Sequence, residues 1–360
     1  MRFPSSVHLV LTLAAFCLTL PLPAADPDWV IALDVPAPLG GANRLPAEVV
    51  ETDGATYSLL ASLPPGTAIG AVDLTPGGTY LLTTTTPSEL GGTTYEARDV
   101  VAWDGAAFSP ALDGGAAGIP EGTSIDGVRE EAEGSILLSF SVPTTLSGTT
   151  FSRSDVVRFD GSTGFSMAFD ASAAGVPPYA DVVGFGVDSA GDLVFAFDVP
   201  TRLGATNFLP GELVRWDGGS FDSYAFDPAW PPFAQIRGLG FFPPAGVVPD
   251  GASVPGIQLT VAETPTGELQ LTWGVSCADS DTDYEVYEGA IGDFAGHTPV
   301  LCSTEGATTA TVAASGDARY YLVVPRNAWR EGSHGSNRDG AERPVGPSPC
   351  LPQLVIASCS

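Results

Sequence analysis

Three carboxylates alternate along one short segment of the chain, at Asp279, Asp281 and Asp283. Alternating acids open the calcium loop of an EF-hand, because calcium takes several oxygen ligands. That loop also needs glycine at its sixth position and glutamate at its twelfth, where this chain has Tyr284 and Ala290. The sequence therefore excludes an EF-hand. A looser calcium site and a solvated loop between strands both remain, and no other cofactor is expected.

A second set of acids recurs at equivalent positions ahead of a short aliphatic run. Its members are Glu48, Asp99, Asp155 and Glu212. A ring of four carboxylates could bind cations or a polar ligand. We favour the alternative, in which each carboxylate caps a loop by accepting hydrogen bonds from nearby backbone amides.

Residues for nucleophilic or acid–base catalysis are scarce, and we predict no catalytic residue. The chain has no lysine for Schiff-base chemistry. Beyond the first 25 residues its histidines are His297 and His334, and no hydrolase, P-loop or Cys-x-x-Cys motif is present. We expect His334, in the sequence Ser333-His334-Gly335, to be an exposed loop residue. A carboxylate pair that cleaves glycans would be assembled only by the fold, so the sequence does not reveal it.

The elements that position these residues come from a repeat. Four copies share a Pro-x-x-Leu and a later Asp-Gly, and the Asp-Gly starts are 51, 56 and 57 residues apart. The Pro/Leu pairs are Pro36/Leu39, Pro87/Leu90, Pro143/Leu146 and Pro200/Leu203, and the Asp-Gly pairs begin at Asp53, Asp104, Asp160 and Asp217. A fixed period of this size predicts stacked or radially arranged modules.

Each copy reads as four short strands. In the third copy they are residues 125–128, 136–142, 155–159 and 165–169, which are rich in β-branched and aromatic residues. Four antiparallel strands make the blade of a β-propeller. We therefore predict an all-β fold with a four-bladed propeller over residues 26–246, rather than a linear solenoid, which would repeat every twenty to thirty residues or so.

The first strand of each unit carries alanine or glycine at its third position, which suits an innermost strand crowded against the axis. The first copy lacks this strand, because residues 29–33 align with the second strand of later copies. Residues 236–242 match the missing strand and follow the fourth copy. We predict that they pair with the blade built from residues 30–61 and so close the ring.

The pattern of residues 187–194 leading to residues 213–218 resembles the blades of NHL-type and kelch-type propellers. The resemblance covers residues 28–246. It rests mostly on turn residues, and only fragments of the kelch Gly-Gly pair and spaced aromatics are present. It implies a propeller and no particular activity, because such propellers carry many functions.

Residues 247–255 read as a linker, and residues 256–360 resemble a fibronectin type III sandwich. Residues 271–273, 284–289 and 319–325 match the family's strands B, C and F, with Trp273 as the core tryptophan. Arg319 departs from the family at the place of its corner tyrosine. The resemblance implies a module that mediates adhesion or acts as a spacer.

The charge balance is strongly acidic, with 42 acids against 14 bases and a net charge of −28. Such a surface repels phosphate backbones and anionic lipid, so we expect neither a nucleic-acid nor a membrane partner. We expect a monomer with an extracellular ligand, possible classes being a glycan or a protein.

The first twenty-five residues read as a secretory signal, with Arg2, an apolar run from Leu9 to Leu22, and small residues before Asp26. Cys17 raises the alternative of a lipoprotein, although Phe16 stands where a small residue is needed. An exported chain favours disulfides. Three pairings of Cys277, Cys302, Cys350 and Cys359 are formally possible, and we favour Cys277–Cys302 with Cys350–Cys359 because sequence neighbours close with the least loop entropy.

These features predict a secreted or periplasmic, non-enzymatic binding or scaffold protein that recognises an extracellular ligand or mediates adhesion. The alternative is a secreted hydrolase that acts on glycan or ester bonds at the propeller face.

Overall fold

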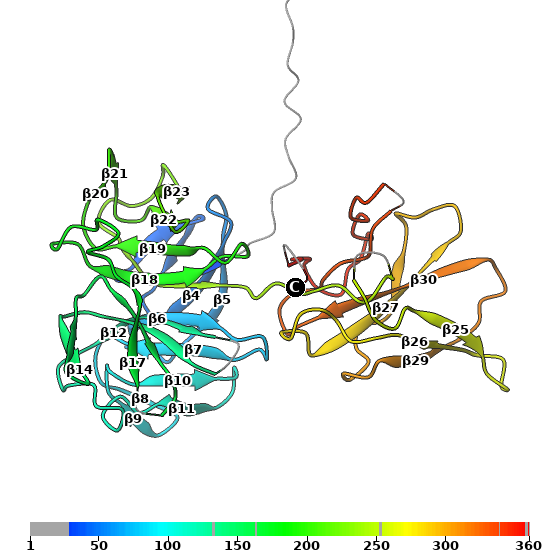
Figure 1. Ribbon diagram of the computed structural model, residues 1–360, viewed down its shortest axis with the longest axis horizontal. Coiled ribbons are helices and arrows are strands. Elements are labelled where there is room, and N and C mark those ends of the chain that lie inside the picture. The colour runs from blue at the N-terminus through cyan, green and yellow to red at the C-terminus, as the bar shows by residue number, and fades with distance from the viewer. Residues whose placement is uncertain are drawn as a thin grey trace, which may run out of the picture.

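The computed structural model describes residues 29–131, 134–162, 164–251, 254–337, 339–356 and 359. The expected signal segment and Cys17 lie outside these residues. Every regular element in the described part is a strand, and none of it is a helix that could cross a membrane. The chain forms two bodies, a group of repeated sheets and a smaller sandwich (Figure 1).

Four antiparallel sheets of four strands each make up the repeat region, which is β-propeller-like. The first contains β24 (Ile236–Phe241), β1 (Trp29–Leu33), β4 (Glu48–Thr52) and β5 (Tyr57–Ser62), in that order. The second contains β6 (Ile69–Leu74), β7 (Tyr80–Thr84), β10 (Val100–Trp103) and β11 (Phe108–Leu112). The third contains β12 (Ile125–Glu130), β13 (Ile136–Phe140), β16 (Val156–Phe159) and β17 (Phe165–Phe169). The fourth contains β18 (Val182–Val187), β19 (Leu193–Phe197), β22 (Leu213–Trp216) and β23 (Phe221–Ala225).

The recurring Pro-x-x-Leu marks a small hairpin inserted between the second and third strands of each sheet. These hairpins are β2–β3 (Ala37–Leu39, Ala42–Arg44), β8–β9 (Ser88–Leu90, Thr93–Tyr95), β14–β15 (Thr144–Leu146, Thr149–Phe151) and β20–β21 (Thr201–Leu203, Thr206–Phe208). The proline precedes the hairpin, and the leucine ends its first strand with a buried side chain. The sequence motif is therefore an anchor that holds each hairpin against its sheet.

The recurring Asp-Gly forms the turn between the third and fourth strands. In the first sheet Asp53 Oδ1 accepts hydrogen bonds from Ala55 N and Thr56 N, and in the second Asp104 Oδ1 accepts from Ala106 N and Ala107 N. The glycine that follows has a positive φ, 87° at Gly54, where a side chain would be strained. The carboxylate and the glycine together define a tight turn at this position.

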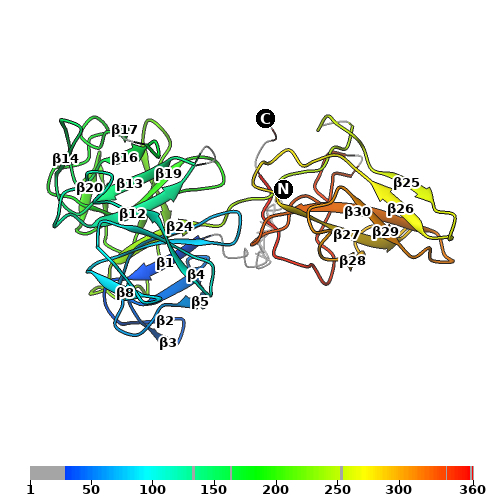
Figure 2. The same ribbon diagram turned by 90° about the horizontal axis from the view of Figure 1, so that it is seen from below.

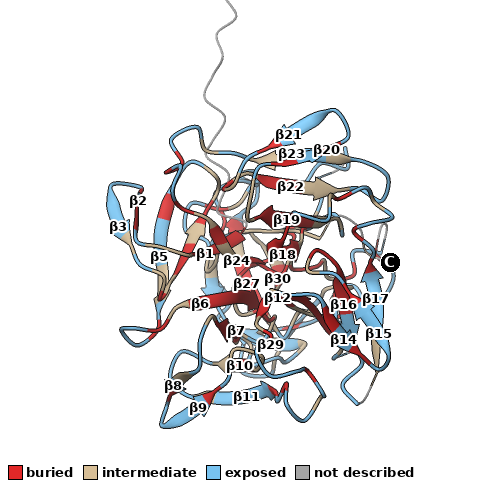
Figure 3. Ribbon diagram, turned by 90° about the vertical axis from the view of Figure 1, so that its left-hand side faces the viewer, coloured by how far each residue is buried: buried red, intermediate tan, exposed pale blue. Residues whose placement is uncertain are grey.

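The inner strands β6, β12, β18 and β24 lie around a common centre (Figure 3), and each contacts the next, with β24 also contacting β6. This crowding explains the glycine at the third position of β12, β18 and β24, while β6 has Ala71 there. A Cβ on Gly127 would lie 2.3 Å from Cδ1 of Phe185, and one on Gly238 would lie 3.0 Å from the backbone nitrogen of Val72.

The last strand of the repeat region pairs with the first. β24 runs antiparallel to β1, with Trp29 opposite Phe241 and Leu33 opposite Ile236. The first sheet thus takes its inner strand from the end of the region, as expected for residues 236–242.

The remainder of the chain forms two three-stranded sheets. One contains β25 (Thr260–Glu263), β26 (Leu269–Thr272) and β29 (Thr309–Val312), and the other β28 (Thr298–Leu301), β27 (Asp283–Ala290) and β30 (Arg319–Arg326). Side chains of both sheets meet in one apolar cluster around Trp273, which packs edge-on against Tyr284. The two sheets therefore form a sandwich with a shared core (Figure 2).

The predicted disulfide pairing is wrong. Cys277 is bonded to Cys359, and Cys302 to Cys350, at sequence separations of 82 and 48 residues. Loop entropy distinguishes pairings only weakly, because each doubling of loop length costs only about 0.6 kcal/mol.

The path of the C-terminal segment overrides that weak preference. This segment runs back beside the sandwich, where Gln353 bridges to Glu331 and Val355 to Ala245. Each of the last two cysteines therefore reaches a partner from an earlier part of the domain.

Candidate functional site

The repeat region has two ends that differ in what lies on them. Antiparallel pairing places the start of each inner strand beside the end of the second strand and the start of the third, as with Ile69, Thr84 and Val100 in the second sheet. This end also carries the four inserted hairpins and the loops that lead into the inner strands. We call it the open end. The opposite end carries the Asp-Gly turns.

The sandwich covers the end opposite to the open end. The Nε1–H of Trp329 donates to the carbonyl oxygen of Thr75 at 2.8 Å, and its ring packs edge-on against Tyr80 and Phe242. The guanidinium of Arg330 lies 3.5 Å from the centre of the Phe242 ring. Asn327 Nδ2 donates to the Pro243 carbonyl oxygen at 2.8 Å. These contacts fix the sandwich to one end and leave the other free (Figures 1 and 3).

At the open end, the second residue of every inner strand is a β-bulge, because the ladder register shifts there. A bulge re-aims its side chain out of the regular alternation. The four bulge residues are Gly70, Asp126, Val183 and Arg237. Two of the four, Asp126 and Arg237, are charged and of opposite sign.

Two further acids lie at the same end. Asp181 immediately precedes β18 and Asp198 immediately follows β19, and Asp198 Oδ1 accepts a hydrogen bond from Asp181 N at 2.8 Å. We call the group of Asp126, Asp181, Asp198 and Arg237 the mouth. Among these, Asp126 is only 2% exposed and Asp181 only 7%.

The mouth contains polar atoms that the protein leaves without a partner. Asp126 Oδ2, Asp181 Oδ1 and Arg237 Nε are buried and make no hydrogen bond to any described residue. Burial raises the pKa of Asp126 to about 7, against the opposing effect of Arg237. Burial and the charges of Asp126 and Asp198 raise the pKa of Asp181 to about 8. At neutral pH these carboxyls therefore bind and release protons readily.

The repeated acids do not join the mouth. In each sheet the carboxylate accepts a hydrogen bond from the amide three residues earlier, as Glu48 Oε2 does from Leu45 N and Asp155 Oδ2 from Ser152 N. Asp99 and Glu212 repeat this contact with Glu96 N and Leu209 N. The capping role predicted for all four acids is confirmed.

The three alternating aspartates also lie elsewhere, in the sandwich. Asp281 Oδ2 accepts hydrogen bonds from Gly246 N and Ser276 Oγ, and Asp283 Oδ1 accepts from Thr304 N and Gly306 N. Asp279 is exposed. Within the described ranges, no three His, Cys, Asp or Glu side chains are placed together to hold a metal ion. Calcium binding stays a prediction.

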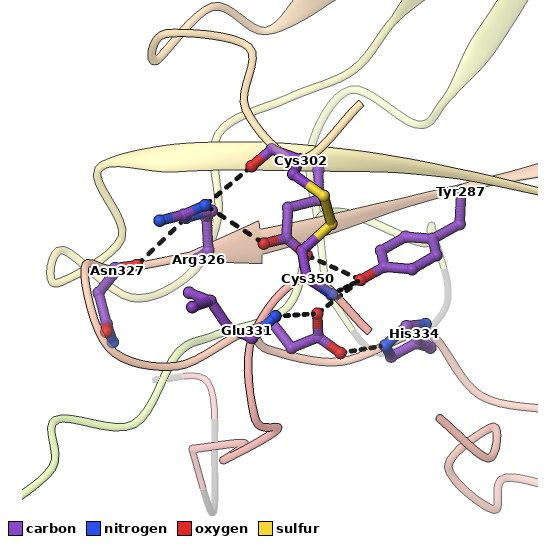
Figure 4. The surroundings of a disulfide bond; sticks show 9 residues. Tyr287, Cys302, Arg326, Asn327, Glu331, His334 and Cys350 are labelled. Carbon is purple, nitrogen blue, oxygen red and sulfur yellow. Dashed lines mark hydrogen bonds and ion pairs between the residues drawn. A yellow bond between two sulfur atoms is a disulfide. The ribbon is translucent and has the colours of Figure 1, made fainter. Parts of the chain in front are cut away.

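The histidines form part of a buried polar chain, so the expectation of an exposed His334 is wrong. His334 is 2% exposed, and its Nε2 lies 2.9 Å from Glu331 Oε1 while its Nδ1 lies 3.0 Å from His297 Nε2. Glu331 Oε2 in turn lies 2.6 Å from the hydroxyl oxygen of Tyr287 (Figure 4). The C-terminal segment covers this group of polar side chains, since Cys350 N donates to the Tyr287 hydroxyl oxygen.

A second buried carboxyl group, that of Glu285, lies beside Tyr287 in the same group of buried polar residues. Burial, with the neighbouring Glu331, raises the pKa of Glu285 to about 9, and the Tyr287 hydroxyl donates to Glu285 Oε2 at 3.0 Å. The same hydroxyl donates to Glu331 Oε2 at 2.6 Å, and His334 Nε2 lies 2.9 Å from the other oxygen of that carboxylate. Glu285 Oε1 makes no hydrogen bond to a described residue, but Arg326 Nη1 lies 3.5 Å from it as an ion pair. We interpret the group as a buried polar network of the sandwich core.

No protein-family model matches the sequence, and no curated protein matches it. Solved structures with partial similarity include a protein of unknown function from Bacteroides caccae, at 10% identity and a TM-score of 0.22, over 69% of this chain and 66% of that one. Another is the extracellular domain of a hybrid two-component system from B. thetaiotaomicron, at 10% identity and a TM-score of 0.26, over 79% and 46%. A third is a catalytically inactive virginiamycin B lyase from Staphylococcus aureus with quinupristin, at 11% and 0.23, over 91% and 87%.

The chain thus spans just under two thirds of the first of these structures and less than half of the second. Similarities at these scores carry no argument about ligand or activity. The functional argument rests on the residues of this chain.

Sequence analysis missed the mouth, although one signal for it was present. The second position of the inner strands reads Gly70, Asp126, Val183 and Arg237, whereas the positions on either side of it keep their character in all copies. A charged residue in a strand that must be buried is costly, and it breaks the symmetry of the repeat. That variation marks a candidate functional position.

Proposed function

We propose that the chain is an exported, non-enzymatic binding or scaffold protein that recognises an extracellular ligand with the open end of its repeat region. The two disulfides support an oxidising compartment, because such bonds persist outside the cytosol. The strongly acidic composition supports the exclusion of nucleic acid and membrane as partners. A monomer is proposed.

The proposal includes a specific architecture. The four sheets are the four blades of a propeller, and β24 closes the ring by supplying the inner strand of the first blade. The β24–β1 ladder and the contacts of each inner strand with the next support this reading. The C-terminal sandwich is a fibronectin type III-like module, which the buried Trp273 between its two sheets supports.

The observation that carries the binding function is the contrast between the two ends. One end is occupied by Trp329, Arg330 and Asn327 of the sandwich. The open end carries loops and hairpins on a rigid scaffold, which is where binding residues are commonly found. It also holds Asp126 and Asp181, whose buried oxygen atoms lack partners. The sandwich then acts as a spacer that directs the open end outward.

A hydrolase is the second candidate, and the mouth supplies the observation that favours it. A general acid needs a carboxyl that is still protonated near neutral pH. Asp126, with a pKa of about 7, and Asp181, with a pKa of about 8, meet that requirement. Two carboxyl groups are also what glycoside cleavage uses.

One experiment separates the two candidates. The purified chain is applied to an array of extracellular glycans and peptides, and the same probes are incubated with it in solution and analysed for products by mass spectrometry. Retention on the array without product supports a binding protein, and product that disappears in Asp126→Asn supports the hydrolase. Hydrogen exchange with a retained probe then locates its site. Protection confined to the sandwich would refute the proposed use of the open end.

A further inference from the structure

The mouth contains two buried carboxylate oxygens that accept no hydrogen bond from the part of the chain that the structure describes. Asp126 Oδ2 and Asp181 Oδ1 are buried, and their residues are 2% and 7% exposed. A buried acceptor without a partner is destabilising, so native proteins rarely keep one unless a ligand or mechanism uses it. Here two such acceptors lie at the same end of neighbouring inner strands, β12 and β18.

We propose that the mouth binds the cationic group of an organic ligand, an ammonium or guanidinium, and that Asp126 and Asp181 accept its hydrogen bonds. This inference rests on the proposed binding function of the open end and specifies its ligand class. Both cations present several N–H donors and no acceptor, which complements a pair of unpartnered carboxylate oxygens.

The loops that lead into the mouth provide apolar surface for the rest of the ligand. Tyr179 is 51% exposed and stands two residues before Asp181, and Phe233 is 61% exposed and stands four residues before Arg237. The Tyr179 carbonyl oxygen accepts a hydrogen bond from Arg153, which holds its loop. Aromatic side chains beside an acidic site favour organic cations, because the ring face attracts positive charge.

The arrangement favours an organic cation over the two other ionic classes. A calcium ion needs six or more oxygen ligands, and the described side chains form no group of three that would hold a metal. An anion would meet three carboxylates and a net charge of −28. Arg237 contributes one unpartnered donor, its Nε, which can bind an acceptor next to the cationic group of the ligand.

Cation binding at this site also predicts a proton release. The groups that act on the two carboxyls are Asp198, Arg153 and Arg237, besides each other. Because the pKa values of Asp126 and Asp181 are about 7 and about 8, both carboxyls are partly protonated at pH 7.5. A bound cation favours the ionised form of each, so binding expels protons into the buffer.

The test is calorimetric titration of the full chain at pH 7.5 with four probes: spermidine, a blocked arginine-containing hexapeptide, a neutral oligosaccharide and calcium chloride alone. The binding enthalpy is measured in two buffers of different ionisation enthalpy. We expect the arginine peptide or spermidine to bind with release of protons. Comparing these two probes shows whether the ligand is a peptide or a free polyamine. The Asp126→Asn/Asp181→Asn variant should bind about ten- to a hundredfold more weakly.

The matched control is Asp222→Asn, an exposed aspartate on β23 at the side of the fourth sheet, which should leave affinity unchanged. Asparagine removes the buried negative charge, so we expect the double variant to fold. Its unfolding midpoint checks this. If the double variant does not fold, the single variant Asp181→Asn takes its place. Binding of cations that the mouth variants do not weaken would overturn the inference. Binding of the neutral oligosaccharide alone at the open end would overturn it and leave the proposed function intact. If none of the four probes binds at the open end, both the cation site and the proposed binding function of the open end are refuted.

Discussion

The indole Nε1–H of Trp329 donates a hydrogen bond to the carbonyl oxygen of Thr75 at 2.8 Å, across 254 residues of sequence. The donor belongs to the loop after the last sandwich strand, and the acceptor to the first turn of the second sheet. Next to it Ala328 N donates to the Pro76 carbonyl oxygen. A tryptophan held by this hydrogen bond and by edge-on contacts with Tyr80 and Phe242 joins the two bodies.

We therefore expect Trp329→Ala to separate the two bodies. The variant loses a partly buried ring and a hydrogen bond, at a cost below the about 3–5 kcal/mol of a fully buried tryptophan. Small-angle scattering should show a larger radius of gyration, and calorimetry should resolve two unfolding transitions. The control is Trp216→Ala, whose ring packs on Phe221 within the fourth sheet. It should lower stability without changing the radius, and an unchanged radius in Trp329→Ala would show that other contacts hold the joint.

The disulfide pairing is testable by peptide mapping without reduction. We expect cross-linked peptides that contain Cys277 with Cys359 and Cys302 with Cys350. Replacing either pair by serine should destabilise the sandwich by about 2–4 kcal/mol and leave the repeat sheets nearly unchanged. Recovery of Cys350 joined to Cys359 would contradict the structure.

The polar chain of the sandwich predicts a costly conservative substitution. Tyr287→Phe removes the hydroxyl that donates to Glu331 and accepts from Cys350 N, so Cys350 N loses this acceptor and Glu331 Oε2 keeps only the 3.4 Å contact with Leu351 N. We expect a loss of about 1–3 kcal/mol for each in urea unfolding. Tyr179→Phe, at an exposed position, is the control and should lie within about 0.5 kcal/mol of the wild type. Equal stability of the two variants would mean that water replaces the lost hydroxyl.

The mouth predicts how the stability of the repeat sheets depends on pH. The pKa values of Asp126 and Asp181 in the folded chain, about 7 and about 8, lie above the ordinary value of 3.8. The folded state therefore binds more protons than the unfolded state between these limits, and stability falls as pH rises from about 4 to about 8. Hydrogen exchange of β12 amides should be slower at pH 5.5 than at pH 8.5 once corrected for intrinsic rates. Asp126→Asn/Asp181→Asn should flatten this dependence, and a dependence that stays unchanged would assign it to other groups.

Calcium is expected to have little effect on the sandwich. Asp281 and Asp283 already accept hydrogen bonds from backbone amides, so a calcium ion would have to displace them. We expect the unfolding midpoint to be the same in excess calcium and in excess chelator. A rise with calcium that is lost in Asp279→Asn would identify the looser site that the alternating aspartates suggested.

The sequence predicted the parts of the fold that repeat. Asp-Gly turns, the small third residue of each inner strand and the orphan strand at residues 236–242 are local signals, and local signals repeated four times reinforce each other. The cysteine pairing was not predictable in this way. It depends on the route of the C-terminal segment past Ala245 and Glu331, which no local preference sets.

The candidate site was harder to predict for a related reason. Asp126, Asp181 and Arg237 come from three different copies of the repeat, and only the arrangement of the sheets brings them to one end. His334 shows the same limit, since Ser, His and Gly in sequence are typical of an exposed loop. Its burial follows from the pairing of its imidazole with Glu331 and His297, which are three and thirty-seven residues away.

The pairing of β24 with β1 sets the order in which the chain can be completed during synthesis. Trp29–Leu33 is made first, and every residue in it is buried in the finished fold. Its partner Ile236–Phe241 is made last among the repeat strands, so at about 5–20 residues per second the first strand waits roughly ten to forty seconds with one edge unpaired. The second, third and fourth sheets can form in sequence during that interval. The first sheet is the last to finish, and until then the ribosome-bound chain presents an apolar strand edge that invites pairing with a neighbouring nascent chain.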